Sequence, residues 1–286
     1  MGPIYLDYNA TTPIDPGVRE AMLPYLGEHF GNPSTTYGYG QRAREAVEHA
    51  RRQVAALIGA TPEEIFFTSG GSESDNHAII GTALANMDRG RHIITSRIEH
   101  PAVMNTCRYL EERLGFSVTY LPVDRYGLVD PDDVRRAIDK ETILITIMHA
   151  NNEVGTIEPI EKIAEIVKER EALFHTDAAQ SCGKIEVNVN HLKVDVLTLA
   201  GHKLYAPKGI GALFVRAGIQ IDSLIHGAGQ EKGRRAGTEN VPYIIGLGTA
   251  CEIARNTLSN YEKETKRLRD RLHARIEAGL GKDRVI

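Results

Sequence analysis

Lys203 follows a short apolar segment that is typical of a buried strand. Residues 194–199 are rich in apolar and β-branched side chains, and the segment ends at Ala200 and Gly201, directly before His202 and Lys203. Burial lowers the pKa of an amine, and a neutral amine can form a Schiff base with an aldehyde. A lysine after a strand is more often a solvated loop residue. Whether Lys203 is a nucleophile must therefore be inferred from the other segments of the chain.

A glycine turn between a predicted strand and a predicted helix could hold an anion. Residues 65–68 are predicted to form the strand, and Gly71 and Ser72 follow it at the start of a helical stretch that continues through Leu84. Free backbone N–H groups and the helix dipole would favour a phosphate at Gly71 and Ser72. The competing interpretation is an ordinary strand-to-helix turn with Ser72 as the N-cap.

Polar side chains also follow three other predicted strands: His100 after residues 92–96, Asn152 after residues 142–148, and Asp177 with Gln180 after residues 173–176. Each has an ordinary alternative, namely a capping or surface role for His100, a turn for Asn152 and a helix N-cap for Asp177. A buried carboxylate needs a partner, however, and a protonated ring nitrogen would serve. Asp177 is therefore a candidate partner for a ligand.

The elements that must position these residues alternate between strand and helix, which predicts an α/β domain with a largely parallel sheet. Further strands are predicted at residues 117–121 and 211–215, and helices from residue 41 and at 131–138, 160–168, 241–254 and 261–278. In such sheets ligands bind at the carboxyl ends of the strands. The candidate residues would share that rim, which favours a cofactor site.

Composition narrows the class of protein. The chain has 286 residues and a net charge of -4 with no long basic block, so we expect no direct nucleic-acid binding. We see no apolar run that could span a membrane and no signal peptide, and we predict no metal site. The three cysteines are scattered and form no disulfide framework, which favours a reducing cytoplasm. A long glycine-rich loop at residues 226–240 is typical of a functional or interface segment.

The candidate residues together match the needs of pyridoxal 5'-phosphate (PLP). An anion turn would hold its phosphate, Lys203 its aldehyde, and Asp177 its ring nitrogen, which must stay protonated for the ring to accept electrons. His100 could stack on the ring, and Gln180 could hydrogen-bond its phenolic oxygen. The sequence thus predicts a PLP site.

Long motifs in order along the chain resemble those of the NifS/IscS-type cysteine desulfurases, which are class V, fold-type I PLP enzymes. The motifs are YLDYNATTP, FGNPS, FTSGGSESDN, EHPAV, HANNEVGTIEP, HTDAAQSCGK, AGHKLYAPKGIGALFVR and HGAGQEKGRRAGTENVP. The resemblance implies a fold-type I large domain with a mostly parallel seven-stranded sheet flanked by helices. It implies this set of roles: Lys203 as the Schiff-base lysine, Asp177 at the ring nitrogen, Gln180 at the phenolic oxygen, His100 stacked on the ring and moving protons, Asn152 near ring and substrate, Gly71, Ser72 and His202 at the phosphate, and Thr238 at the phosphate of the partner subunit in a homodimer.

The resemblance also implies a domain plan and two departures from it. We expect residues 1–15 to pack with a small domain, residues 16–255 to form the large PLP-binding domain, and residues 256–286 to lead toward a small C-terminal domain that is mostly absent. Family members usually carry a serine at position 200, where this chain has Ala200. They also continue into a loop with the persulfide cysteine, which we do not find here. We expect Cys107, Cys182 and Cys251 to be structural.

The leading functional hypothesis is a cysteine desulfurase that converts L-cysteine to L-alanine and delivers sulfur through an enzyme persulfide. Its partners would be an iron–sulfur cluster scaffold or another sulfur-acceptor protein, including one that serves tRNA thiolation. One alternative is another class V enzyme, such as a selenocysteine lyase or an aminotransferase. A second alternative is a PLP-binding scaffold without turnover, since the persulfide loop is missing.

Overall fold

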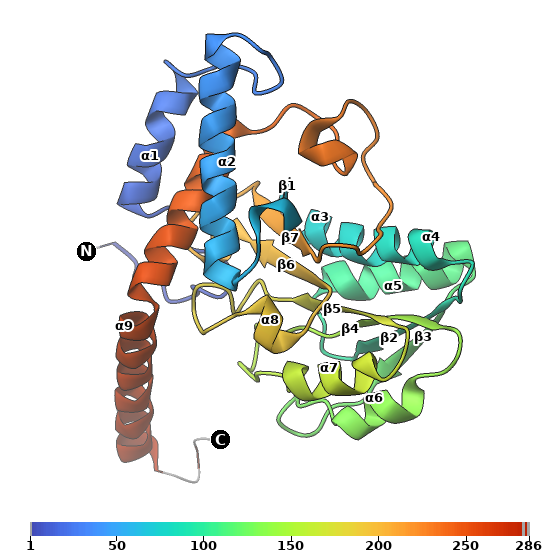
Figure 1. The fold of residues 1–286 in the computed structure, drawn as a ribbon. Helices are drawn as coiled ribbons and strands as arrows, with labels where there is room; N and C mark the ends of the chain where they lie inside the picture. The colour runs from blue at the N-terminus through green and yellow to red at the C-terminus, as the bar shows by residue number, and fades with distance from the viewer. Residues whose placement is uncertain (1, 282–283, 285–286) are drawn as a thin grey trace.

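The computed structural model describes residues 2–281 and 284, and its centre is one seven-stranded sheet (Figure 1). The strand order is β1-β7-β6-β5-β4-β2-β3, in which β7 is antiparallel to both of its neighbours and all other pairs are parallel. The mostly parallel sheet expected from the sequence is therefore confirmed. The strands are β1 (Ile65–Thr68), β2 (His92–Ser96), β3 (Ser117–Leu121), β4 (Thr142–Thr146), β5 (Leu173–Asp177), β6 (Val196–Ala200) and β7 (Gly211–Val215).

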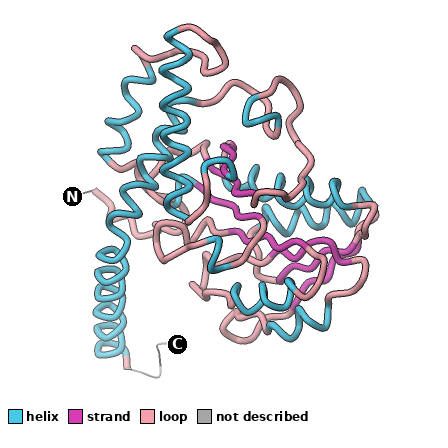
Figure 2. The backbone as a smooth tube through the Cα atoms, viewed as in Figure 1, coloured by secondary structure: helices cyan, strands magenta, loops and turns pink. Residues whose placement is uncertain are grey.

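Helices cover both faces of the sheet (Figures 1 and 2). The helices are α1 (Pro16–Leu26), α2 (Gly38–Ile58), α3 (Gly71–Asn76), α4 (Thr82–Asn86), α5 (Pro101–Leu114), α6 (Pro131–Ala137), α7 (Ile160–Lys168), α8 (Val189–Leu192) and α9 (Val241–Leu280), with a π-helical turn η2 (His77–Gly81) between α3 and α4 and 3₁₀ turns η1 (Pro62–Glu64), η3 (Gly201–Lys203) and η4 (Gln230–Gly233). Among the described residues, no helix is both long and apolar enough to cross a membrane.

Alternate side chains of the strands pack on opposite faces of the sheet. Ile94 and Ile145 join the apolar cluster that includes α2 and α7, whereas Ile93 and Leu144 join the cluster beneath α4 and α5. Both faces are therefore dry, as is usual for parallel sheets. Polar side chains of the sheet can reach a ligand only where the strands end. A ligand site built from the sheet is therefore expected at the strand ends.

The last helix corrects one sequence expectation. Residues 241–254 and 261–278 were expected to form two helices, but α9 is a single helix of 40 residues from Val241 to Leu280. The intervening residues 255–260 contain neither Pro nor Gly, so the backbone hydrogen bonds continue through them. The first part of α9 packs against α1 and α2, and its far part extends away from the sheet (Figure 1). The proposed domain boundary between residues 255 and 256 stays a prediction.

Candidate active site

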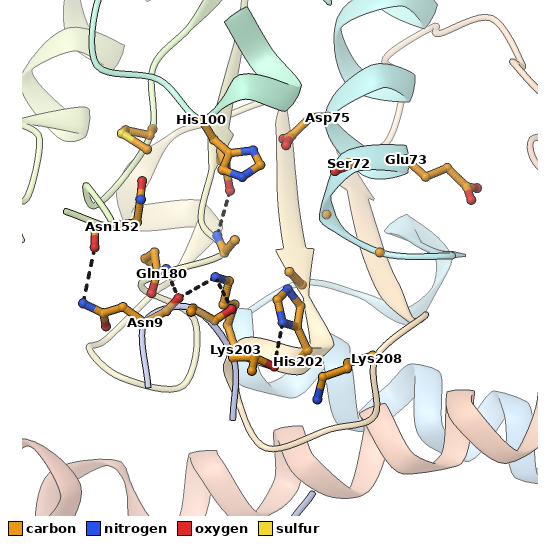
Figure 3. A pocket seen from close by; sticks show the side chains of 18 of the residues that line it. Asn9, Ser72, Glu73, Asp75, His100, Asn152, Gln180, His202, Lys203 and Lys208 are labelled. Carbon is orange, nitrogen blue, oxygen red and sulfur yellow. Dashed lines mark hydrogen bonds between the residues drawn. The ribbon is translucent and has the colours of Figure 1, made fainter. Parts of the chain in front are cut away.

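A cavity of about 870 Å³ lies at the carboxyl ends of the parallel strands (Figure 3). It brings together eight of the nine site residues expected from the sequence: Gly71, Ser72, His100, Asn152, Asp177, Gln180, His202 and Lys203. Thr238 is the exception, because it lines a smaller, adjoining cavity next to Ser69 and Ile210, which border both. The clustering expected from the strand ends is therefore what the tertiary structure shows.

Lys203 ends the 3₁₀ turn η3, which directly follows β6. Its Nζ donates hydrogen bonds to the backbone carbonyl oxygens of Asn9 at 2.5 Å and Ala10 at 3.0 Å (Figure 3). Burial lowers the pKa of Lys203, although the charge of Asp177 acts in the opposite direction. A half-buried amine with lowered pKa and neutral acceptors is suited to attack an aldehyde.

Asp177 is the last residue of β5 rather than the residue after it, because its backbone still pairs with Thr198 of β6. Its Oδ1 accepts a hydrogen bond from the backbone N–H of Ala179 at 2.9 Å. Burial raises the pKa of Asp177, while His100 and Lys203 oppose that rise. This carboxylate can stabilise a protonated group that enters the cavity.

Asp75 is a second buried carboxyl group on the cavity wall, and the sequence interpretation missed it. Within the described part of the chain its Oδ1 has no hydrogen-bond partner, and it lies 3.8 Å from Nε2 of His175. Burial lowers the pKa of His175 to about 3, so this contact joins an acid to a neutral imidazole and is not an ion pair. Burial and the nearby Asp177 raise the pKa of Asp75 well above its usual value. No periodicity in the sequence could reveal Asp75, which lies inside a short helix.

His100 caps α5, and its side chain also borders the cavity. The ring Nδ1 accepts a hydrogen bond from the backbone N–H of Ala102 at 3.1 Å. When the ring is neutral its proton therefore resides on Nε2. The capping interpretation and the site interpretation of His100 are compatible, since capping fixes the ring at the rim.

The N-terminal segment also lines the cavity, through Asp7, Asn9, Ala10 and Thr11, and the sequence interpretation did not assign it to the site. Nδ1 of His202 lies 3.2 Å from Oγ1 of Thr11, and the backbone oxygen of His202 accepts from the backbone N–H of Thr12 at 3.0 Å. Burial, followed by the charge of Lys203, lowers the pKa of His202. The available signal was the turn-rich segment Asn9 to Pro13, which lies far from Lys203 in sequence.

Gln180 and Asn152 also contact this N-terminal segment. Nε2 of Gln180 donates to the backbone oxygen of Asn9 at 3.0 Å, and Nδ2 of Asn9 donates to the backbone oxygen of Asn152 at 3.3 Å (Figure 3). The side chain of Asn152 donates to Oε1 of Glu153 at 2.6 Å. Asn9 thus links the Gln180 side chain to the backbone of Asn152, which follow two separate strands.

The glycine turn lies at the other end of the cavity. The helical run begins at Gly71 with Gly70 as the N-cap, so the N-cap role considered for Ser72 is wrong. Gly70 has a φ of 148°, which favours glycine, and a Cβ on Gly71 would lie 3.1 Å from Cβ of Ala200. Glycine therefore allows this turn and its close packing against β6, and among the described residues the first N–H groups of the helix have no backbone partner and could bind an anion.

Comparisons with known proteins agree with this geometry. The family profile described as "Aminotransferase class-V" matches residues 4–282. "Cysteine desulfurase IscS" of Methanosarcina thermophila is 55% identical over 94% of this chain and 66% of its own length. A solved "NIFS-LIKE PROTEIN" superposes with a TM-score of 0.92 at 44% identity, covering 95% of this chain and 74% of that one.

The chain belongs to the class-V aminotransferases, among the NifS/IscS-type cysteine desulfurases. It spans about two-thirds of the length of the curated relatives that it matches. A second solved relative, "SspA in complex with cysteine", has a TM-score of 0.85 at 48% identity and covers 87% of this chain and 72% of that one. Proteins of this family depend on PLP, which makes PLP the cofactor to test against the cavity.

The residues of this class-V chain fit PLP. Asp177 is a buried acid that forms no ion pair among the described residues, which suits the ring nitrogen. The glycine turn at Gly71 and Ser72 lines the cavity, which suits a phosphate. Lys203 would hold the aldehyde carbon, and Gln180 has a second amide hydrogen available for the ring oxygen. The site contains a donor or acceptor for each polar end of the cofactor.

The three cysteines of the class-V chain are buried and free. Burial raises the pKa of Cys107 to about 12 and also raises the pKa values of Cys182 and Cys251 above the usual range. Since the thiolate is the reactive form, none of them is an effective nucleophile at neutral pH. Their burial agrees with the structural role expected from the sequence.

Proposed function

We propose that this protein is a PLP-dependent cysteine desulfurase. The observation that carries the proposal is one cavity in which the amine of Lys203 and the buried carboxylate of Asp177 face the glycine turn at Gly71. The relatives named as cysteine desulfurases, and the relative solved with cysteine, support this choice of substrate.

The proposed reaction transfers one sulfur atom. The C–S bond of L-cysteine breaks, a thiol R–SH accepts the sulfur to become the persulfide R–S–SH, and L-alanine is released. PLP, when bound, supplies an electron sink for the carbanion at the substrate's α-carbon. The atoms balance without an external oxidant or reductant.

The protein's own residues would divide the remaining work. Lys203 would hold the cofactor through Nζ and, once released, would move a proton at the substrate's α-carbon. Asp177 would accept the hydrogen bond of the ring nitrogen, and His100 would stand over the ring with Nε2 available for proton transfer. Gly71, Ser72 and His202 would hold the phosphate.

The partners belong to the same proposal. We expect a homodimer in which Thr238 reaches the neighbouring subunit's phosphate, which is supported by its position in an adjoining cavity. We expect the sulfur to pass to an iron–sulfur scaffold or another acceptor protein in the cytoplasm. Three free cysteines without a disulfide are compatible with that reducing compartment.

The test is alanine formation from L-cysteine with saturating PLP and dithiothreitol as the sulfur acceptor. The wild-type protein should form alanine and sulfide in equal amounts over many turnovers. Lys203→Ala should lower the rate by at least about 10³-fold, whereas Lys168→Ala, an exposed lysine on α7, should leave it unchanged.

The covalent attachment gives an independent check. Borohydride reduction followed by peptide mass mapping should place the cofactor on Lys203. A Lys203→Ala protein that still carried borohydride-fixed cofactor, or a PLP-loaded wild-type protein that formed no alanine, would contradict the proposal.

A further inference from the structure

Lys184 is a second half-buried amine beside the cavity, and the sequence interpretation gave it no role. Its Nζ donates a hydrogen bond to Oε1 of Gln180 at 2.5 Å. Burial lowers its pKa to about 8, with a further contribution from the charge of Lys203. Among the described residues no carboxylate forms an ion pair with it, so Gln180 is the partner that accounts for its position.

The backbone around Lys184 is tightly held. Its N–H donates to the backbone oxygen of Ser181 at 3.0 Å, and Cys182 forms a parallel bridge with Ile185. Gly183 has a φ of 74°, and a Cβ at that position would lie 3.1 Å from Cβ of Ala254. This tight turn directs the lysine side chain back toward Gln180, four residues earlier.

The contact fixes which end of the Gln180 amide is which. A lysine can only donate, so the atom that faces Lys184 must be the oxygen. The nitrogen end already donates to the backbone oxygen of Asn9 at 3.0 Å. A flipped amide would oppose N–H to ammonium on one side and oxygen to carbonyl oxygen on the other. Two independent partners therefore enforce the same orientation.

The same contacts connect Lys184 to Lys203. The backbone oxygen of Asn9 accepts from both Gln180 and Lys203, so the order of contacts is Lys184, Gln180, Asn9, Lys203 (Figure 3 shows the last three). One hydrogen of the Gln180 amide remains free, and Gln180 lines the cavity. This orientation presents a donor, not an acceptor, to whatever oxygen enters the cavity.

We propose that Lys184 is a positioning residue. It holds the Gln180 amide with an N–H group toward the cavity, and it places its own positive charge next to the Gln180 oxygen. This proposal rests on the proposed function: in the PLP-bound protein, Lys184 would stabilise the anionic form of the PLP ring oxygen. The residue acts through Gln180 and does not contact the cofactor itself.

The test is the dissociation constant of PLP for the apo-protein, together with the absorbance spectrum of the bound form. Lys184→Met should weaken PLP binding about tenfold and change the ratio of the absorbance bands, because the donor and its charge are lost. Lys184→Arg, which also donates, should stay within about threefold of wild type. Lys168→Met on α7 is the matched surface control and should match wild type.

A double-mutant cycle separates positioning from general stability. In a Gln180→Leu background, Lys184→Met should change PLP binding by less than about twofold, because the amide that it orients is gone. Equal effects in both backgrounds would overturn the proposal. Gln180→Glu keeps a partner for Lys184 but removes the N–H, so it should weaken PLP binding at least as much as Lys184→Met.

The outcomes distinguish the two proposals. A wild-type protein that did not bind PLP would contradict the proposed function. A wild-type protein that bound PLP, with a folded Lys184→Met variant of the same affinity and spectrum, would contradict only the role of Lys184.

Discussion

The amines and the acids around the cavity respond to burial in opposite directions. The amine side consists of Lys203 and Lys184, whose pKa values burial lowers. The acid side consists of Asp177 and Asp75, which line the cavity, and the buried Glu99, which does not line it; burial raises all three pKa values. In each group the low-dielectric surroundings favour the neutral form. The cavity therefore favours a reactive amine on one side and, on the other, an acid that gains a cationic partner when a ligand enters.

The two sides also differ in how they are built. The amines are half-exposed and donate to neutral oxygens, those of Asn9, Ala10 and Gln180. The acids are buried, and the charge of Asp177 raises the pKa values of both Asp75 and Glu99. Burial therefore favours the neutral form of the amines and the protonated form of the acids, so the two sides respond to pH in opposite directions.

Neutralising one acid at a time is the strongest test of this difference between the acids and the amines. If the proposed function holds, Asp177→Asn would remove the ionised partner of the ring nitrogen, so PLP-dependent alanine formation should fall roughly 10- to 100-fold, as expected for a hydrogen bond to a charged group. Asp75→Asn, which replaces an acid already favoured as neutral, should lower it less than about threefold. Equal losses in the two variants would show that Asp75 is ionised in the working site.

The acids should also make the free energy of unfolding depend on pH between pH 6.5 and 8. Burial raises the pKa of Glu99 from 4.5 to about 8, so the folded protein keeps a proton that the unfolded chain has lost. Stability should therefore fall as pH rises, by up to about 1.4 kcal/mol per pH unit for each such proton. His149 and His175, with pKa values lowered to about 4 and about 3, act in the opposite direction only below about pH 6.5.

Glu99→Gln isolates that share of the pH dependence. Urea unfolding at pH 6.5 and pH 8 should show a smaller loss of stability in Glu99→Gln than in wild type, by about 1–2 kcal/mol. Glu112→Gln, on the exposed face of α5, is the control and should keep the wild-type slope. An unchanged slope in Glu99→Gln would mean that Glu99 is ionised in the folded protein.

The smallest expected effect lies at the glycine turn. Ala200→Ser adds a hydroxyl group beside Gly71, where the resemblance leads us to expect a missing phosphate contact. PLP should bind about fivefold more tightly to the apo-protein, equivalent to about 1 kcal/mol for one added hydrogen bond. Pyridoxal, which lacks the phosphate, is the comparison ligand. If the hydroxyl acts on the phosphate, Ala200→Ser should bind PLP more tightly and pyridoxal no more tightly than wild type does; equal gains for both ligands would contradict this.

Much of the fold could be predicted, because the strands are short apolar segments with clear ends. The ranges 92–96, 117–121 and 211–215 match β2, β3 and β7, and 160–168 matches α7. The break expected in α9 was wrong, since polar residues alone do not end a helix without Gly, Pro or a cap. Strand ends near Asp177 and Ala200 shifted by a residue because pairing with the neighbouring strand, not composition, decides where a strand stops.

The sequence by itself determined which residues follow the strands, and the geometry of parallel sheets then required His100, Asp177 and Lys203 to meet at one edge. Only the tertiary structure decided what surrounds them. The N-terminal carbonyls at Asn9 and Ala10, the buried Asp75 and the grip of Lys184 on Gln180 depend on contacts between distant or irregular segments. Such contacts have no periodicity along the chain, because they arise from the packing of loops and not from a repeating backbone geometry.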